Sequence, residues 1–281
     1  MKNALYVLLV LTTTILISCK KDDMNDDTNL ENLPIDTGGL HNAYPLGQTS
    51  AYYGFYAYTP SAYLKSSAKY PLLVFLHGAG EQGNSKTDAK ILDIVLRNGP
   101  PKLIEGKKWK PKYPMIVVSP QCHDGGWNAI KVHQFIKYLI DNYQVNTERI
   151  YITGLSMGGF GTYSYLTTIG DSCYVAAAVP ICGGGSTYNV KAMKHIPVWA
   201  FHGDADLTVN VAGSINMINA INAVNPPVKA KLTIYPGVGH DSWSKTYDGS
   251  GMGSERSDYD AFNMSIYDWM FQYKLNQFKG Q

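Results

Sequence analysis

A hexapeptide with three glycines around one serine restricts the fold of this chain more than any other feature. Gly154-Leu155-Ser156-Met157-Gly158-Gly159 follows residues 149–153, which favour a buried strand, and precedes residues 160–166, which favour a helix. Glycines two residues either side of Ser156 let the strand and the helix approach without a clash of Cβ atoms. The pattern is typical of a nucleophile elbow, a strained turn that raises a serine hydroxyl above a sheet. We therefore expect Ser156 to be a nucleophile.

Strands and helices are expected to alternate along the chain. Continuous apolar or β-prone runs predict strands at residues 51–58, 71–77, 114–120, 149–153, 174–181, 196–201 and 229–235. Helical patterns occupy residues 88–98, 132–140, 160–166, 212–224 and 259–278. This alternation predicts an α/β protein with a mostly parallel central sheet and helices on both faces. The 281 residues, 45% of them hydrophobic, suit one such domain.

The N-terminal region differs from the rest of the chain. Ala4 to Ile17 is an apolar run too short to span a bilayer, and Leu16-Ile17-Ser18-Cys19 resembles a bacterial lipobox. We expect residues 1–18 to be a signal peptide and Cys19 to be lipidated; a plain secretory signal with a chance cysteine is the alternative. The protein would then be an exported lipoprotein anchored in a membrane, in the periplasm or on the surface of a Gram-negative bacterium.

A linker is expected to follow the anchor. Lys20 to Thr37 is rich in Asp and Asn and has few large apolar residues, so it cannot bury enough surface to fold. We expect residues 19–48 to carry the lipid and form a flexible tether, and residues 49–281 to form the catalytic domain.

A serine nucleophile needs a base and an acid at the C-terminal ends of later strands. His240 lies in a Gly-rich loop after the last predicted strand and is the expected base. The acid lies in the segment Phe201-His202-Gly203-Asp204-Ala205-Asp206, where two aspartates compete. Asp206 is favoured because it lies farther out on the loop, whereas Asp204 suits a turn. His77 and His202 close strands and are expected to brace loops.

Oxyanion donors are expected from two backbone segments. One is the amide of Met157, the residue after the nucleophile, and the other is the loop after the strand at 71–77. In that loop Ala79 is the first candidate and Gly80 the second. Trp127 and Trp243 lie near the expected rim and are candidate substrate contacts, with loop packing as the alternative.

Several motifs together resemble a known family. His77-Gly78-Ala79-Gly80-Glu81, Gly154–Gly161, Trp199–Asp206 and Gly239-His240-Asp241-Ser242-Trp243 resemble the phospholipase/carboxylesterase group of α/β hydrolases, sometimes labelled "predicted peptidase". The group is similar to polyhydroxybutyrate depolymerases and to the feruloyl and acetyl-xylan esterases of carbohydrate esterase family 1. The resemblance implies hydrolysis of carboxyl esters through an acyl-enzyme, with no metal or cofactor.

Three function classes follow from these observations. The first is a serine esterase acting on acetyl, feruloyl or other short acyl esters, with a small ester or an acylated plant polysaccharide as substrate. The second is a serine peptidase of the prolyl-oligopeptidase type, and the third is a non-catalytic binding lipoprotein. A formal charge of +2 and the lack of a basic block argue against nucleic acid as a partner. Cys122, Cys173 and Cys182 allow one disulfide, or are three buried thiols.

Overall fold

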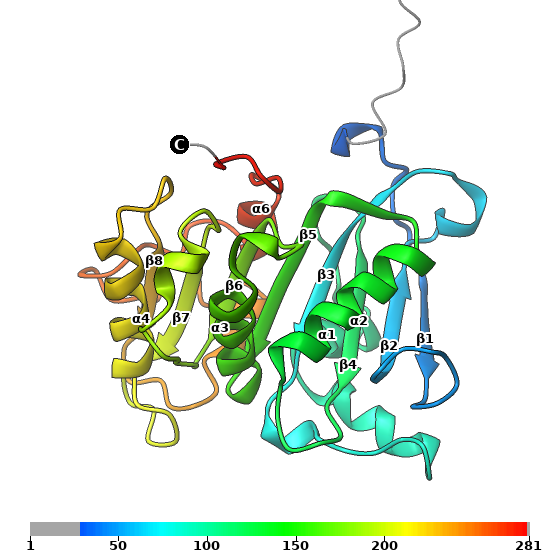
Figure 1. Ribbon diagram of the computed structural model, residues 1–281, viewed down its shortest axis with the longest axis horizontal. Coiled ribbons are helices and arrows are strands. Elements are labelled where there is room, and N and C mark those ends of the chain that lie inside the picture. The colour runs from blue at the N-terminus through cyan, green and yellow to red at the C-terminus, as the bar shows by residue number, and fades with distance from the viewer. Residues whose placement is uncertain (1–28, 280–281) are drawn as a thin grey trace, which may run out of the picture.

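The computed structural model describes residues 29–279, which form one eight-stranded sheet. Its strand order is β1-β2-β4-β3-β5-β6-β7-β8 (Figure 1). The strands are β1 (Leu40–Tyr44), β2 (Gly54–Thr59), β3 (Tyr70–Leu76), β4 (Ile116–Gln121), β5 (Val145–Leu155), β6 (Ala177–Ile181), β7 (Trp199–Gly203) and β8 (Lys231–Tyr235). β2 pairs antiparallel with β1 and β4, and every later pairing from β4 to β8 is parallel. The parallel strands therefore end at one common edge.

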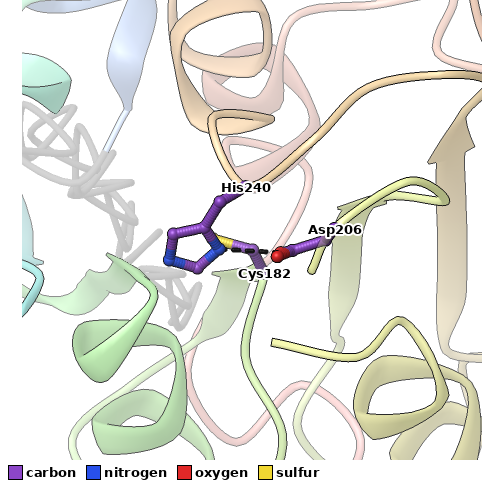
Figure 2. A group of neighbouring side chains, drawn as sticks. All are labelled: Cys182, Asp206 and His240. Atoms are coloured by element: carbon purple, nitrogen blue, oxygen red, sulfur yellow. Dashed lines mark hydrogen bonds and ion pairs between the residues drawn. The ribbon is translucent and has the colours of Figure 1, made fainter. Parts of the chain in front are cut away.

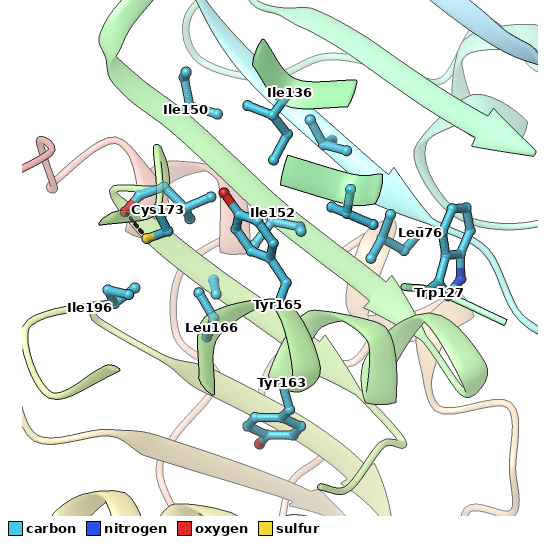
Figure 3. Close-up of a cluster of buried hydrophobic side chains, with 14 of the residues drawn as sticks. Leu76, Trp127, Ile136, Ile150, Ile152, Tyr163, Tyr165, Leu166, Cys173 and Ile196 are labelled. Atoms are coloured by element: carbon cyan, nitrogen blue, oxygen red, sulfur yellow. Dashed lines mark hydrogen bonds between the residues drawn. The ribbon is translucent and has the colours of Figure 1, made fainter. Parts of the chain in front are cut away.

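Helices cover both faces of this sheet. The α-helices are α1 (Gly99–Glu105), α2 (Ala129–Asn142), α3 (Met157–Ile169), α4 (Ala212–Ala223), α5 (Trp243–Tyr247) and α6 (Ile266–Met270). Short 3-10 helices are η1 (Leu30–Asn32), η2 (Tyr63–Lys65), η3 (Ala79–Glu81), η4 (Ala89–Arg97), η5 (Gly170–Ser172) and η6 (Val190–Met193). The core on one face includes residues of α2, α3 and α4, and part of it is drawn in Figure 3. The other face packs against α1, α5 and α6 (Figure 1).

The continuous apolar runs are explained by these two cores. In β3, Leu72 and Val74 belong to the core under α2 and α3, whereas Leu73 and Phe75 belong to the opposite core. A strand covered on both faces has no solvent side, so its sequence does not alternate. The predicted α/β class, with a mostly parallel sheet and helices on both faces, is confirmed.

The predicted helix at 259–278 is wrong, because only Ile266–Met270 is α-helical. Asp260 instead follows the free edge of β8. Its amide donates to the carbonyl of Leu232 at 2.8 Å, and its carboxylate accepts from the Leu232 amide at 2.8 Å. The carbonyl of Asp260 also accepts from the hydroxyl of Thr233. The unpaired polar groups of an edge strand thus hold this segment out of helical conformation.

The predicted end of the tether at residue 48 is also too late. Leu40–Tyr44 forms β1, with Leu40 opposite Thr59 and Tyr44 opposite Phe55. This edge strand is largely exposed, so its sequence carries no burial pattern and only its backbone pairing reveals it. The proposed signal peptide and Cys19 lie outside the described residues. Within residues 29–279, no helix has the length and apolar character needed to cross a membrane.

Candidate active site

Ser156 occupies a strained turn between β5 and α3. Its backbone has φ 52° and ψ −117°, a conformation that non-glycine residues rarely adopt and that costs about 1–3 kcal/mol. Its amide donates to the carbonyl of Ile181 at 3.0 Å, which anchors the turn to β6. A Cβ on Gly158 would lie 1.9 Å from the carbonyl oxygen of Leu76, and one on Gly154 would lie 2.4 Å from that of Gly158. Both flanking glycines are therefore required by the close approach of backbone segments.

The structure brings Ser156, His240 and Asp206 into one hydrogen-bonded line. Ser156 Oγ lies 2.9 Å from His240 Nε2, and His240 Nδ1 lies 2.7 Å from Asp206 Oδ2. Asp206 follows β7, His240 follows β8 and Ser156 follows β5, so all three lie at the carboxyl edge of the sheet. An ionised carboxylate only accepts, so Nδ1 carries the proton and Nε2 accepts from the serine hydroxyl.

Asp206 is buried, and several donors surround its carboxylate. Oδ1 accepts from the amides of Thr208 at 2.8 Å and Val209 at 2.9 Å. Oδ2 lies 2.7 Å from His240 Nδ1 and 3.2 Å from His202 Nε2. Burial opposes ionisation, but the bonds from His240, Val209 and Thr208 outweigh it and lower the pKa of Asp206. The carboxylate can therefore remain charged beside the imidazole.

Asp204, the competing aspartate, braces the loop of His240 instead. Its Oδ1 accepts from the amide of Gly237 at 2.7 Å, and its Oδ2 lies 3.3 Å from the guanidinium of Arg256. It therefore helps to hold the loop after β8 in place. Asp204 makes no hydrogen bond to His240 among the contacts of the described chain.

The loop expected to supply oxyanion donors lies against the serine. A Cβ on Gly78 would be 3.6 Å from Ser156 Cβ. Ala79 and Gly80 are exposed, and the space beside Gly80 is open. Within residues 29–279, the amides of Ala79 and Met157 donate to no protein acceptor. Met157 begins α3, where the first amides have no partner within the helix. Two amides without a protein acceptor thus lie in the two segments next to Ser156, the first turn of α3 and the loop that follows Gly78.

Trp127 does not fit the predicted role in substrate contact, because its side chain is buried. Its indole N–H donates to the carbonyl of His77 at 3.0 Å, and its ring meets the imidazole of His77 edge-on. Trp127 therefore braces the loop that follows β3, the alternative interpretation of this residue. Trp243 is only half-buried and lies edge-on to His240, with ring centroids 5.2 Å apart.

His77 is buried and closes the same loop from below. Its Nδ1 lies 2.6 Å from the carbonyl oxygen of Gly78, and its Nε2 accepts from the amide of Cys122 at 2.9 Å. Burial lowers the pKa of His77 from 6.5 to about 4, against the effect of the Gly78 carbonyl. His77 is thus a neutral imidazole with its proton on Nδ1, in the bracing role expected for it.

Sequence reasoning missed Cys182, which lies beside the line, and Asn98, which reaches it through Trp243. Cys182 Sγ accepts from the Ser156 amide at 3.3 Å and lies beside the His240–Asp206 contact, as Figure 2 shows. Burial raises the pKa of its thiol to about 12. Asn98 joins the indole of Trp243 to the buried carboxyl group of Glu81. No local motif marks Cys182 or Asn98, since each acts through a partner distant in sequence. All three cysteines of the described chain are free and buried.

A family model and a solved structure both relate this chain to esterases. Residues 123–248, which include Ser156, Asp206 and His240, match the model of the phospholipase/carboxylesterase family. A crystal structure of a thermostable esterase superposes with a TM-score of 0.61 at 27% identity, over 84% of this chain and 63% of that chain. The chain has the α/β-hydrolase fold. Its resemblance to the phospholipase/carboxylesterase group is confirmed.

Other similar proteins carry esterase names. The bifunctional acetylxylan esterase/xylanase XynS20E of Neocallimastix patriciarum is 28% identical over 164 residues, which are 55% of this chain and 22% of that protein. A mutant feruloyl esterase module from Clostridium thermocellum, complexed with sinapinate, superposes with a TM-score of 0.51 at 20% identity, over 78% of this chain and 87% of that one. The chain spans about a fifth of the length of this curated relative. The expected ester-hydrolase class agrees with these names.

Proposed function

We propose that this α/β hydrolase is a serine carboxyl-ester hydrolase that works through an acyl-enzyme. The observation that carries the proposal is the continuous line from Ser156 Oγ through His240 to Asp206, with contacts of 2.9 and 2.7 Å. Such a line supplies a nucleophile, a base and a group that orients the base. The esterase names of the relatives support the same reaction class.

Acylation begins when Ser156 Oγ attacks the ester carbonyl while His240 Nε2 takes its proton. The carbonyl oxygen becomes an oxyanion, for which the free amides of Met157 and Ala79 are the proposed donors, with Gly80 second. The intermediate collapses with cleavage of the C–O bond to the alcohol, and His240 returns the proton to the leaving oxygen. Asp206 holds the Nδ1–H tautomer and stabilises the imidazolium without taking the proton.

Deacylation repeats these steps with water. His240 Nε2 removes a proton from a water molecule as that water attacks the acyl carbonyl. The second tetrahedral intermediate expels Ser156 Oγ, which regains a proton from His240, and the carboxylic acid leaves. No residue changes its oxidation state, and the line of hydrogen bonds is restored.

Acetyl, feruloyl or other short acyl esters, including those of plant polysaccharide, are the proposed substrates. Relatives named acetylxylan esterase and feruloyl esterase support this class. The exposed loop at Ala79 and Gly80 and the partly exposed side chain of His240 leave the serine open to a group carried on a bulky polymer. The half-buried ring of Trp243 offers an apolar surface beside the base.

The test is a panel of p-nitrophenyl acetate, a long-chain p-nitrophenyl ester, methyl ferulate and acetylated xylan. We expect turnover of the short or aryl esters, labelling by a fluorophosphonate probe, and loss of both in Ser156→Ala. Peptidyl-anilides serve as the competing substrate. Cleavage of anilides with esters untouched would indicate a peptidase, and an unlabelled wild-type protein would indicate a binding protein.

We also propose that the protein is exported and held at a membrane by a lipid on Cys19, facing the periplasm or the cell exterior. The lipobox-like segment Leu16-Ile17-Ser18-Cys19 supports this. Cells that express the full chain and are fed a labelled fatty acid should incorporate label. Incorporation that persists in Cys19→Ala would refute the anchor.

A further inference from the structure

A second histidine contacts the carboxylate of Asp206. His202, in β7, is fully buried, and its Nε2 lies 3.2 Å from Asp206 Oδ2 and 2.9 Å from the carbonyl oxygen of Val209. Both of these oxygens are acceptors, so Nε2 must carry a proton. His202 therefore donates to the same carboxylate oxygen that accepts from His240.

The other side of the His202 ring is joined to α4. Nδ1 lies 2.8 Å from Ser214 Oγ, and that hydroxyl also lies 3.1 Å from the carbonyl oxygen of Gly183. Burial lowers the pKa of His202, although Val209 and Asp206 oppose this effect. A neutral ring with its proton on Nε2 has a lone pair on Nδ1, and this lone pair and the Gly183 carbonyl oxygen compete for the one proton of the Ser214 hydroxyl. The two acceptors that face Nε2, Asp206 Oδ2 and the Val209 carbonyl, thus select the tautomer that donates to Asp206.

The loop that carries Asp206 has little packing of its own. Ala205 and Thr208 are exposed, and Leu207 is 100% exposed, although the Asp206 side chain between them is buried. Apolar contacts from these neighbours therefore cannot hold the carboxylate in place. Hydrogen bonds must do so, and His202 is the donor among them that comes from the rigid sheet.

We propose that His202 is a positioning residue: its Nε2–H fixes the carboxylate of Asp206 against His240. This role rests on the proposed hydrolase function. A neutral donor suits it, because a cationic ring beside Asp206 would share the negative charge that stabilises the imidazolium of His240. His202 itself touches no reacting atom.

The test compares two substitutions at one position. His202→Gln keeps an amide donor near the place of Nε2, whereas His202→Leu keeps much of the volume and removes the donor. We expect Leu to lower kcat on p-nitrophenyl acetate about tenfold to a hundredfold with little change in KM, because a buried carboxylate loses one partner. Gln should recover kcat to within about fivefold of wild type. His195→Gln, at the exposed His195–Asp171 pair, is the matched control and should change nothing.

Proton NMR gives a readout that does not depend on turnover. The downfield resonance of the His240 Nδ1–H that faces Asp206 should shift or broaden in His202→Leu and persist in His202→Gln. The resonance is followed across pH, because three other titratable groups, His202, Cys182 and Asp241, lie near the His240–Asp206 pair. A Leu variant with wild-type kcat and an unchanged resonance would overturn the proposal, and so would equal losses in Leu and Gln.

A second variant covers the case in which His202→Leu does not fold. Ser214→Ala keeps the imidazole and removes the hydroxyl that contacts Nδ1 and helps to hold the orientation of the ring, and we expect it to lower kcat about threefold to tenfold and to alter the same resonance. Wild-type kcat with an unaltered resonance would refute the role of His202. If wild-type protein hydrolyses no ester, the proposed function fails, while the NMR comparison still decides whether His202 positions Asp206.

Discussion

The indole N–H of Trp127 donates to the backbone carbonyl of His77 at 3.0 Å, and this contact ties the start of α2 to the loop beside Ser156. The carbonyl of His77 directly precedes Gly78, whose backbone lies against the serine. A residue that resembles a rim aromatic in sequence is therefore part of the support beneath the proposed oxyanion donors.

Trp127→Phe should lower kcat for ester hydrolysis about tenfold and leave KM nearly unchanged. The ring volume is mostly kept, but the His77 carbonyl loses its donor, and the loop amides lose their position relative to the oxyanion. Steady-state kinetics on p-nitrophenyl acetate measure the effect. Trp109→Phe is the control, because the Trp109 indole N–H has no partner in the described chain. Equal kinetics for the two variants would contradict this role of Trp127.

We expect Trp243 to support His240 through its ring more than through its N–H. The ring lies edge-on to the imidazole, whereas the N–H donates to Asn98 at 3.2 Å. We expect Trp243→Phe to keep kcat/KM within about fivefold of wild type and Trp243→Ala to lower it about tenfold or more. Matched kinetics on one ester measure both. Equal losses would instead assign the effect to the bond with Asn98.

Gly158→Ala should prevent or strongly impair folding. The new methyl group would lie 1.9 Å from the carbonyl oxygen of Leu76, so backbone must move, at a cost of about 3 kcal/mol or more. Urea unfolding followed by circular dichroism measures the change. Gly80→Ala is the matched control and should leave stability within about 0.5 kcal/mol, because no atom lies within 4 Å of its new methyl group. A stable Gly158→Ala protein would show that the elbow tolerates a wider separation of β3 and α3.

His77 should make the protein less stable as pH falls from about 6.5 to about 4. Its pKa is lowered to about 4 in the folded state, so the unfolded chain binds more protons within that window. The free energy of unfolding should fall by up to about 3 kcal/mol from this one group as the pH drops. Denaturant titrations at several pH values measure the slope. The slope of the unfolding free energy against pH measures the protons taken up on unfolding, and in His77→Asn it should correspond to up to one proton fewer. An unchanged slope would contradict a buried neutral His77.

The parallel core and the elbow could be predicted because their signals are local. A strand buried on both faces needs an unbroken apolar run, as in Leu72 to Leu76, and a strained serine turn needs glycines at fixed offsets. The order of Ser156, Asp206 and His240 after β5, β7 and β8 also lies along the chain. Each of these features depends on residues that are close together in the chain, so its position follows from the amino-acid sequence.

The remaining features depend on partners that are distant in the chain. β1 is recognised by its pairing with β2, and the segment at Asp260 leaves helical conformation because the edge of β8 offers hydrogen bonds. The burial of Trp127 and the contact of His202 with Asp206 likewise depend on how strands and loops assemble. Local propensities are worth about tenths of a kcal/mol per residue, whereas satisfying a buried polar group is worth about 1–3 kcal/mol. Assembly of the whole domain therefore determined these contacts, and the chain's local chemistry determined the elbow and its order of partners.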